Sequence, residues 1–137
     1  ADQKHLGLFK PGEHGSTFGG NPLGAAVARV ALQVIVEEKL IKRSEEMGNY
    51  FMDQLSEINS PLVKEVRGRG LLIGVELKKE AGGARQYCEA LMKKGILVKE
   101  THENVIRFAP PLIIDKGTID TAIQSIREVL LITFPMD

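Results

Sequence analysis

The apolar positions between residues 22 and 38 predict a long helix. Asn21 is a good N-cap, Pro22 suits the first helical position, and Glu37 and Glu38 mark the far end. Apolar residues cover most of its circumference: Leu23, Ala25, Ala26, Val27, Val30, Ala31, Leu32, Val34, Ile35 and Val36. A helix that is apolar all round is buried on most sides. We therefore expect this helix to pack on something outside the present chain.

A second helix is predicted over residues 40–58, because apolar residues recur there at steps of three and four and leave one polar side. The sequence Asn-Ser-Pro at residues 59–61 ends it. A strand follows, in which Leu71, Ile73, Val75 and Leu77 alternate with residues of the other face. Two glycines, at positions 68 and 70, are expected to bend or break the strand that precedes it.

The last third of the chain predicts two more helices and a hairpin. An apolar stripe over residues 84–92 forms one helix, ended by Gly95. The segments ILVKET and VIRFAP read as two short strands on either side of residues 102–104, and we expect them to pair. A final helix starts at an Asp115 cap and presents apolar residues at helical spacing. This order of elements predicts the α+β class, with a small, mostly antiparallel sheet covered by helices on one face.

Composition narrows the classes of function. The 137 residues carry 18 basic and 18 acidic side chains, so no overall field favours nucleic acid, a membrane surface or an acidic partner. The one cysteine cannot form an internal disulfide, and no His/Cys cluster suits zinc. No apolar run reaches the ~18 residues that span a bilayer, and the first residues do not resemble a signal peptide. We expect a soluble, cytoplasmic protein whose upstream targeting signals, if present, lie outside the printed sequence.

The segment GEHGSTFGGNP is a candidate anion-binding loop. Ser16 and Thr17 sit between glycines in a loop that leads directly into a helix N-terminus, where hydroxyls, backbone N–H groups and the helix dipole favour a phosphate. The segment matches neither common phosphate-binding glycine pattern, so a plain glycine-rich turn is the competing interpretation.

Arg107 is the second candidate, because it interrupts the apolar strand VIRFAP. A guanidinium in such a place is a natural bidentate ligand for a substrate carboxylate. An exposed strand residue or an internal ion pair explains it equally well.

Other reactive residue types have structural explanations. Arg67 and Arg69 lack interleaved aromatic residues and fit a bend between glycines better than a nucleic-acid contact. His14 and His102 have no companion at ligand spacing, so we expect no metal site. Cys88 falls on an apolar helical stripe, where a core position is expected rather than a nucleophile.

Taken together, these motifs resemble a known family. GEHGSTFGGNPLGAAVA is similar to the loop and helix of the class III, pyridoxal-phosphate-dependent aminotransferases, and EVRGRGLLIGVEL and KETHENVIRFAPPLII are similar to their C-terminal domain. Within the family, the KETH…VIRFAPPL combination most resembles the ornithine aminotransferases. The resemblance implies the C-terminal domain of a fold-type I transferase, divided into a phosphate-contact loop at residues 1–21, an interdomain helix and its successor at 22–58, and an α+β domain at 59–137.

The resemblance also implies roles for single residues. Ser16 and Thr17 would contact the phosphate of pyridoxal 5'-phosphate in the neighbouring subunit of a homodimer, and Arg107 would receive a carboxylate of the amino-acid or 2-oxo-acid substrate. The Schiff-base lysine of the family belongs to an upstream motif that neither Lys4 nor Lys10 matches. The chain alone is therefore expected to hold no catalytic residue and to be inactive.

Three functions stay open at this point. The longer protein would transfer the δ-amino group of ornithine to 2-oxoglutarate, or it would use acetylornithine or another ω-amino compound. A free-standing α+β domain that binds a small molecule is the third possibility.

Overall fold

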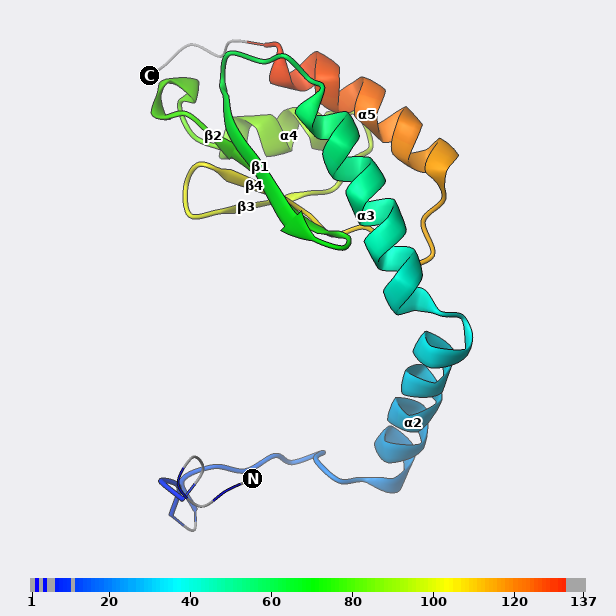
Figure 1. The fold of residues 1–137 in the computed structure, drawn as a ribbon. Helices are drawn as coiled ribbons and strands as arrows, with labels where there is room; N and C mark the ends of the chain where they lie inside the picture. The colour runs from blue at the N-terminus through cyan, green and yellow to red at the C-terminus, as the bar shows by residue number, and fades with distance from the viewer. Residues whose placement is uncertain (1, 3, 5–6, 11, 133–137) are drawn as a thin grey trace. The chain divides into compact units, whose positions relative to one another are not determined.

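The chain divides by its internal contacts into two units, Ala1–Glu38 and Lys39–Asp137. The structure is a computed structural model that describes residues 2, 4, 7–10 and 12–132. The first unit contains helix α2 (Pro22–Glu37), and the second contains a four-stranded sheet and three helices (Figure 1). The three-part division at residues 1–21, 22–58 and 59–137 stays a prediction.

Helix α2 begins and ends as its sequence predicts. The Asn21 side chain accepts a hydrogen bond from the Gly24 N–H at 2.7 Å, and Pro22 occupies the first turn. After the helix, Lys39 adopts a left-handed conformation with φ 53°. No residue of α2 is buried, and its exposed large apolar side chains are Leu23, Val27, Val30, Leu32, Val34 and Val36. Within the described residues of its own unit nothing covers this helix, so its expected packing partner stays a prediction.

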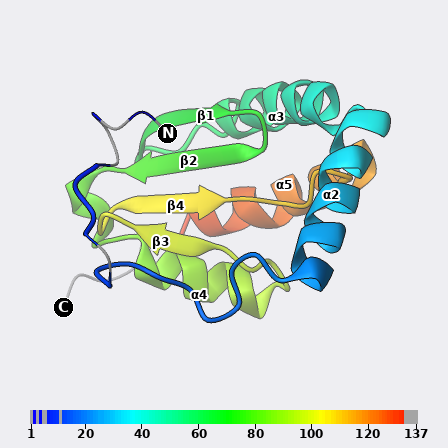
Figure 2. The same ribbon diagram turned by 90° about the horizontal axis from the view of Figure 1, so that it is seen from below.

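The second unit is built on a sheet with the strand order β1-β2-β4-β3, and every neighbouring pair is antiparallel (Figure 2). The strands are β1 (Val63–Arg69), β2 (Leu72–Leu77), β3 (Lys99–Thr101) and β4 (Val105–Phe108). The expected hairpin of β3 and β4 is confirmed, and β4 also pairs with β2 in the centre of the sheet. This arrangement confirms the α+β class with an antiparallel sheet.

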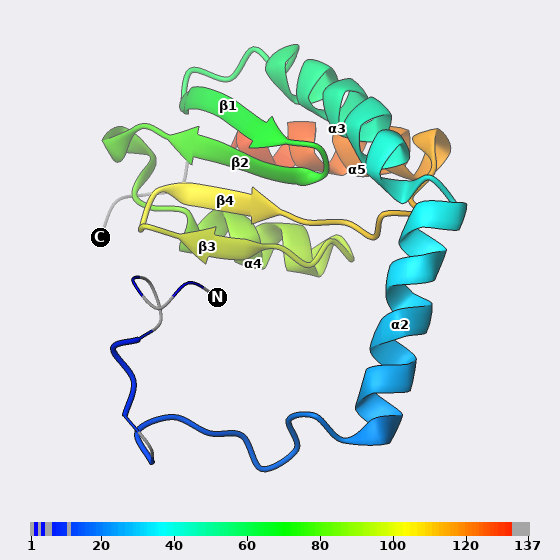
Figure 3. The same ribbon diagram turned by 60° about the horizontal axis from the view of Figure 1, so that its bottom comes forward.

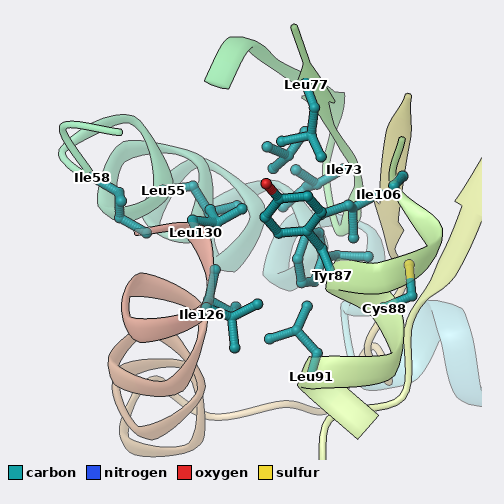
Figure 4. Packing of buried hydrophobic residues seen from close by; sticks show 14 of the residues in the cluster. Leu55, Ile58, Ile73, Leu77, Tyr87, Cys88, Leu91, Ile106, Ile126 and Leu130 are labelled. Carbon is teal, nitrogen blue, oxygen red and sulfur yellow. The ribbon is translucent and has the colours of Figure 1, made fainter. Parts of the chain in front are cut away.

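Three helices cover one face of the sheet: α3 (Leu40–Ser56), α4 (Arg85–Lys93) and α5 (Lys116–Leu130) (Figure 3). Helices α3 and α4 contact the strands, and α5 packs against both of these helices. Figure 4 shows side chains from all three helices meeting those of β2 and β4 in one cluster. The core side chains with less than 2% exposure are Tyr87, Leu55, Ile73, Leu77, Leu91, Ile106, Ile119, Ile126, Leu130, Val75 and Val129.

A glycine pair lets α3 approach the turn between β1 and β2. A Cβ on Gly48 would lie 2.1 Å from the Gly70 carbonyl oxygen, so only glycine fits at that position of α3. Gly70 has φ 55°, and the Ser44 hydroxyl accepts a hydrogen bond from the Leu71 N–H at 3.2 Å. The helix and the turn are thus fixed to each other.

Two details differ from the sequence-based elements. The second helix ends at Ser56 rather than near Ile58, although Ile58 is still buried in the core. A short 3-10 turn at Lys79–Ala81 follows β2, and three residues are too few to give a periodic signal. No helix among the described residues is long and apolar enough to cross a membrane.

Candidate functional site

The glycine-rich loop before α2 is held by its own side chains. The Ser16 hydroxyl accepts a hydrogen bond from the Gly19 N–H at 2.9 Å, and the Asn21 amide donates to the Phe18 carbonyl at 2.6 Å. Ser16 and Thr17 are both exposed. The Ser16 O–H can still donate, and the Thr17 hydroxyl bonds to no described residue, so two hydroxyl donors are available to an anion.

The α2 N-terminus itself offers less to an anion than its sequence suggests. Pro22 has no N–H, and the Gly24 N–H is already bonded to Asn21. The hydroxyl groups of the loop therefore add donors to the Leu23 N–H, from which no described residue accepts a hydrogen bond. This donor set fits part of a phosphate-binding site, and the rest of such a site would come from residues outside this loop.

Arg107 projects from the face of the sheet that the helices leave uncovered. Its neighbours in β4, Ile106 and Phe108, are buried on the covered face, while Arg107 is exposed. In the strand register Arg107 lies opposite Gly74 of β2 on one side and Lys99 of β3 on the other. No described side chain forms an ion pair or hydrogen bond with its guanidinium, so the internal ion pair weighed from the sequence is absent within the described chain.

The same face carries a compact ion-pair group on β1 and β2. Glu76 contacts Lys64 and Arg67, each at 2.5 Å, and Arg67 also contacts Glu65 at 2.9 Å. These cations, Lys64 first and then Arg67, lower the pKa of the Glu76 carboxyl below its usual value. Arg67 is thereby neutralised by carboxylates of its own sheet, which agrees with a structural role.

The glycines beside Arg67 act at two different points. Gly68 lies within β1, where a Cβ would approach the Leu72 carbonyl oxygen to 2.6 Å, and Gly70 forms the turn after the strand. Gly68 therefore permits a close strand pair, and only Gly70 ends the strand.

Cys88 is a core residue, as expected. It lies in α4 with 6% exposure, and burial raises the pKa of its thiol to about 11. A thiol that stays protonated at neutral pH is a poor nucleophile.

The histidines show no grouping with other ligands. His14 stacks on Phe9 with 5.3 Å between ring centroids, and His102 lies in the turn between β3 and β4. No group of three His, Cys, Asp or Glu side chains within the described part of the chain could hold a metal ion.

Sequence reasoning missed Lys99 as a neighbour of Arg107. The signal was present, because two strands joined by residues 102–104 bring Lys99 opposite Arg107 if Thr101 pairs with Val105. The sequence alone does not fix this register, so it does not predict that Lys99 and Arg107 are neighbours.

Comparison with known proteins now identifies the family. The class-III aminotransferase family profile matches residues 1–130, and the chain belongs to this family. An ornithine aminotransferase of Brevibacillus brevis is 58% identical over 133 residues, which are 97% of this chain and 33% of that protein. The ornithine aminotransferase of Bacillus subtilis is also 58% identical, over 95% of this chain and 32% of its own length. The chain thus spans about a third of the length of the curated relatives it matches.

Solved structures agree with this assignment. An ornithine aminotransferase of Plasmodium yoelii superposes with a TM-score of 0.82 at 37% identity, covering 95% of this chain and 35% of that one. An acetylornithine aminotransferase of Elizabethkingia anophelis gives a TM-score of 0.79 at 39% identity, over 96% and 35% of the two chains. The fold is that of a part of these larger aminotransferases.

Proposed function

We propose that this chain is the C-terminal part of an ornithine aminotransferase that transfers the δ-amino group of ornithine to 2-oxoglutarate. The observation that carries the proposal is the 58% identity to curated ornithine aminotransferases over almost the whole chain. The 39% identity to an acetylornithine aminotransferase leaves acetylornithine as the second candidate amino donor. A free-standing binding domain is disfavoured, because the family profile extends from the first residues through α5.

The residues present fit pyridoxal 5'-phosphate as a cofactor of the longer protein. Ser16 and Thr17 would donate hydrogen bonds from their exposed hydroxyls to its phosphate, across the interface of a homodimer. When bound, the cofactor supplies an electron-accepting group that carries the amino group from donor to acceptor. No catalytic residue is assigned to this chain, and the lysine required for covalent attachment would come from upstream.

Arg107 would bind and orient a substrate carboxylate. Its guanidinium is exposed, has no described partner and stands on an ordered central strand. A planar guanidinium with two parallel N–H donors fixes a carboxylate in one orientation, which a single ammonium does not. Holding the substrate at its carboxylate would place the amino or keto carbon at a defined distance from the cofactor.

Donor competition on the longer protein tests the proposed substrate. With 2-oxoglutarate as acceptor, we expect ornithine to outcompete N-acetylornithine by at least about tenfold in kcat/KM. Preference for N-acetylornithine would assign the second donor instead. The 137-residue chain alone is expected to catalyse no transamination, and turnover by purified chain with added cofactor would contradict the absence of a catalytic residue.

A further inference from the structure

The two glycines within the described strands, Gly68 and Gly74, differ in how much room surrounds them. A Cβ on Gly68 would lie 2.6 Å from the Leu72 carbonyl oxygen, so the backbone of β2 excludes a side chain there. A Cβ on Gly74 would meet nothing closer than a Val105 methyl group at 3.3 Å. Val105 is only partly buried, so its side chain can move by the few tenths of an ångström that are needed. Packing therefore requires glycine at position 68 but not at position 74.

The backbone of Gly74 does not require glycine either. Its φ is not positive, so other residues can adopt its conformation. Glycine weakens the interior of a strand, and it often marks a place where a ligand or another backbone approaches closely. Apart from its chain neighbours, the backbone atom nearest to a Cβ on Gly74 is the Arg67 carbonyl oxygen, at 3.9 Å. A ligand or a segment from outside the unit is therefore left as the reason for this glycine.

Gly74 lies between two arginines on the uncovered face of the sheet. The register places Arg67 of β1 on one side of it and Arg107 of β4 on the other. Directly opposite residues have Cβ atoms about 4.5–5.5 Å apart, so a side chain at position 74 would stand beside that of Arg107. Arg67 is held by Glu65 and Glu76. Arg107 is exposed and pairs with no described side chain, so the open position adjoins a guanidinium that is free to bind an anion.

We propose that Gly74 is a specificity-determining residue of the carboxylate site, which leaves the β2 side of Arg107 open for the carboxylate and adjacent carbon atoms of an unbranched 2-oxo acid. The proposal rests on the aminotransferase function proposed above. A bidentate carboxylate lies in the plane of the guanidinium, so it needs a side of Arg107 that no other side chain occupies. A β-branched residue at position 74 would hold its methyl groups on that side, because its χ1 angle is stiff.

The test uses the longer enzyme with Gly74→Val, Gly74→Ala and the control Leu72→Val. Leu72 lies on the same strand and the same face with 60% exposure, but it is opposite Arg69 rather than Arg107. We expect Gly74→Val to raise the KM for 2-oxoglutarate about five- to tenfold with kcat nearly unchanged, because a contact common to bound substrate and transition state is weakened. Gly74→Ala should raise this KM by less than about threefold, since one methyl group nearly fits, and Leu72→Val should leave it unchanged.

A double-mutant cycle with Arg107→Ala separates a role at the carboxylate from a role in packing. If Gly74 acts by keeping Arg107 accessible, Gly74→Val should lower kcat/KM for 2-oxoglutarate by less than about twofold in the Arg107→Ala background. The full effect of Gly74→Val in that background would overturn the proposal. A loss of cofactor binding and thermal stability in Gly74→Val alone would also overturn it, because it would assign this position to packing against a segment from outside the unit.

A binding measurement separates this proposal from the proposed function. Glutarate, an unreactive dicarboxylate, is titrated by calorimetry into the same variants, and we expect a Kd about five- to tenfold weaker for Gly74→Val and nearly unchanged for Leu72→Val. Lack of ornithine turnover with this loss of glutarate binding would overturn the proposed reaction and keep the role of Gly74. Wild-type KM and Kd in Gly74→Val, or equal changes in Leu72→Val, would overturn the role of Gly74 whatever the reaction is.

Discussion

Helices α2 and α5 are nearly equal in length, with 16 and 15 residues, yet they are stabilised in different ways. Helix α5 buries five residues against its neighbours: Ile119, Ile123, Ile126, Val129 and Leu130. Helix α2 buries none, although its sequence is more apolar. The second unit therefore contains its own core, whereas the first unit has an apolar helix surface that nothing within that unit covers.

Truncation of one apolar residue in each helix tests this difference most strongly. In the 137-residue chain, Ile126→Ala should lower the free energy of unfolding by about 3–4 kcal/mol, since Ile126 is fully buried and its loss leaves a cavity. Leu32→Ala in α2 should change it by less than about 0.5 kcal/mol, because Leu32 is 66% exposed. Urea denaturation measures both values. Similar losses in the two variants would mean that α2 is buried within the chain itself.

A smaller effect is expected at the turn between β3 and β4, where the second unit holds a strained backbone. His102 and Glu103 have φ values of 49° and 60°, a left-handed conformation that favours glycine. Glu103→Gly should therefore stabilise the chain by about 1 kcal/mol in the same urea experiment. Glu103→Ala is the matched control, because it removes the carboxylate and keeps the strain. An equal gain in both variants would attribute the effect to charge.

The smallest effect concerns acid stability at the edge of the second unit. The pKa of Glu100 is lowered from its ordinary value of 4.5 to about 2 by a hydrogen bond from its own backbone and by Arg85 and Lys99. A lowered pKa in the folded state stabilises the protein above the unfolded value, and this contribution is lost as the pH falls from about 4.5 towards 2.

Stability of the wild type and of Glu100→Gln should accordingly converge over that pH range. Thermal unfolding at closely spaced pH values measures the two curves. Glu45→Gln is the control, since Glu45 is exposed and forms no ion pair with a described residue. A constant gap between wild type and Glu100→Gln from pH 5 to 2 would contradict the assigned pKa.

The helices and strands of both units follow from local sequence signals. Asn21 and Asp115 cap α2 and α5 with their side chains, and the alternation of Ile73, Val75 and Leu77 gives the strand its buried face. These signals act between residues close in sequence, so they can be read without a structure.

The candidate site could be predicted only in part, because its neighbours are set by tertiary contacts. Arg107 was recognisable as a charge within an apolar strand, but its position beside Gly74 depends on the pairing of β2 with β4. Residues 78–104 separate these two strands, so no local signal encodes the pairing. The close approach of Gly48 to Gly70 also joins residues of two different elements, so local sequence signals do not predict it. The position of Lys99 opposite Arg107 likewise follows only once the strand register is known.

The central claim is that the two units carry different functions, with Ser16 and Thr17 of the first binding the cofactor phosphate and Arg107 of the second binding the substrate carboxylate. One crossed measurement on the longer enzyme tests it directly: the cofactor Kd and the 2-oxoglutarate KM for Thr17→Ala and Arg107→Ala. The account predicts about tenfold weaker cofactor binding with a nearly unchanged KM in Thr17→Ala, and a KM raised at least about tenfold with unchanged cofactor binding in Arg107→Ala. Wild-type values for both quantities in both variants, or the same change in both, would contradict it.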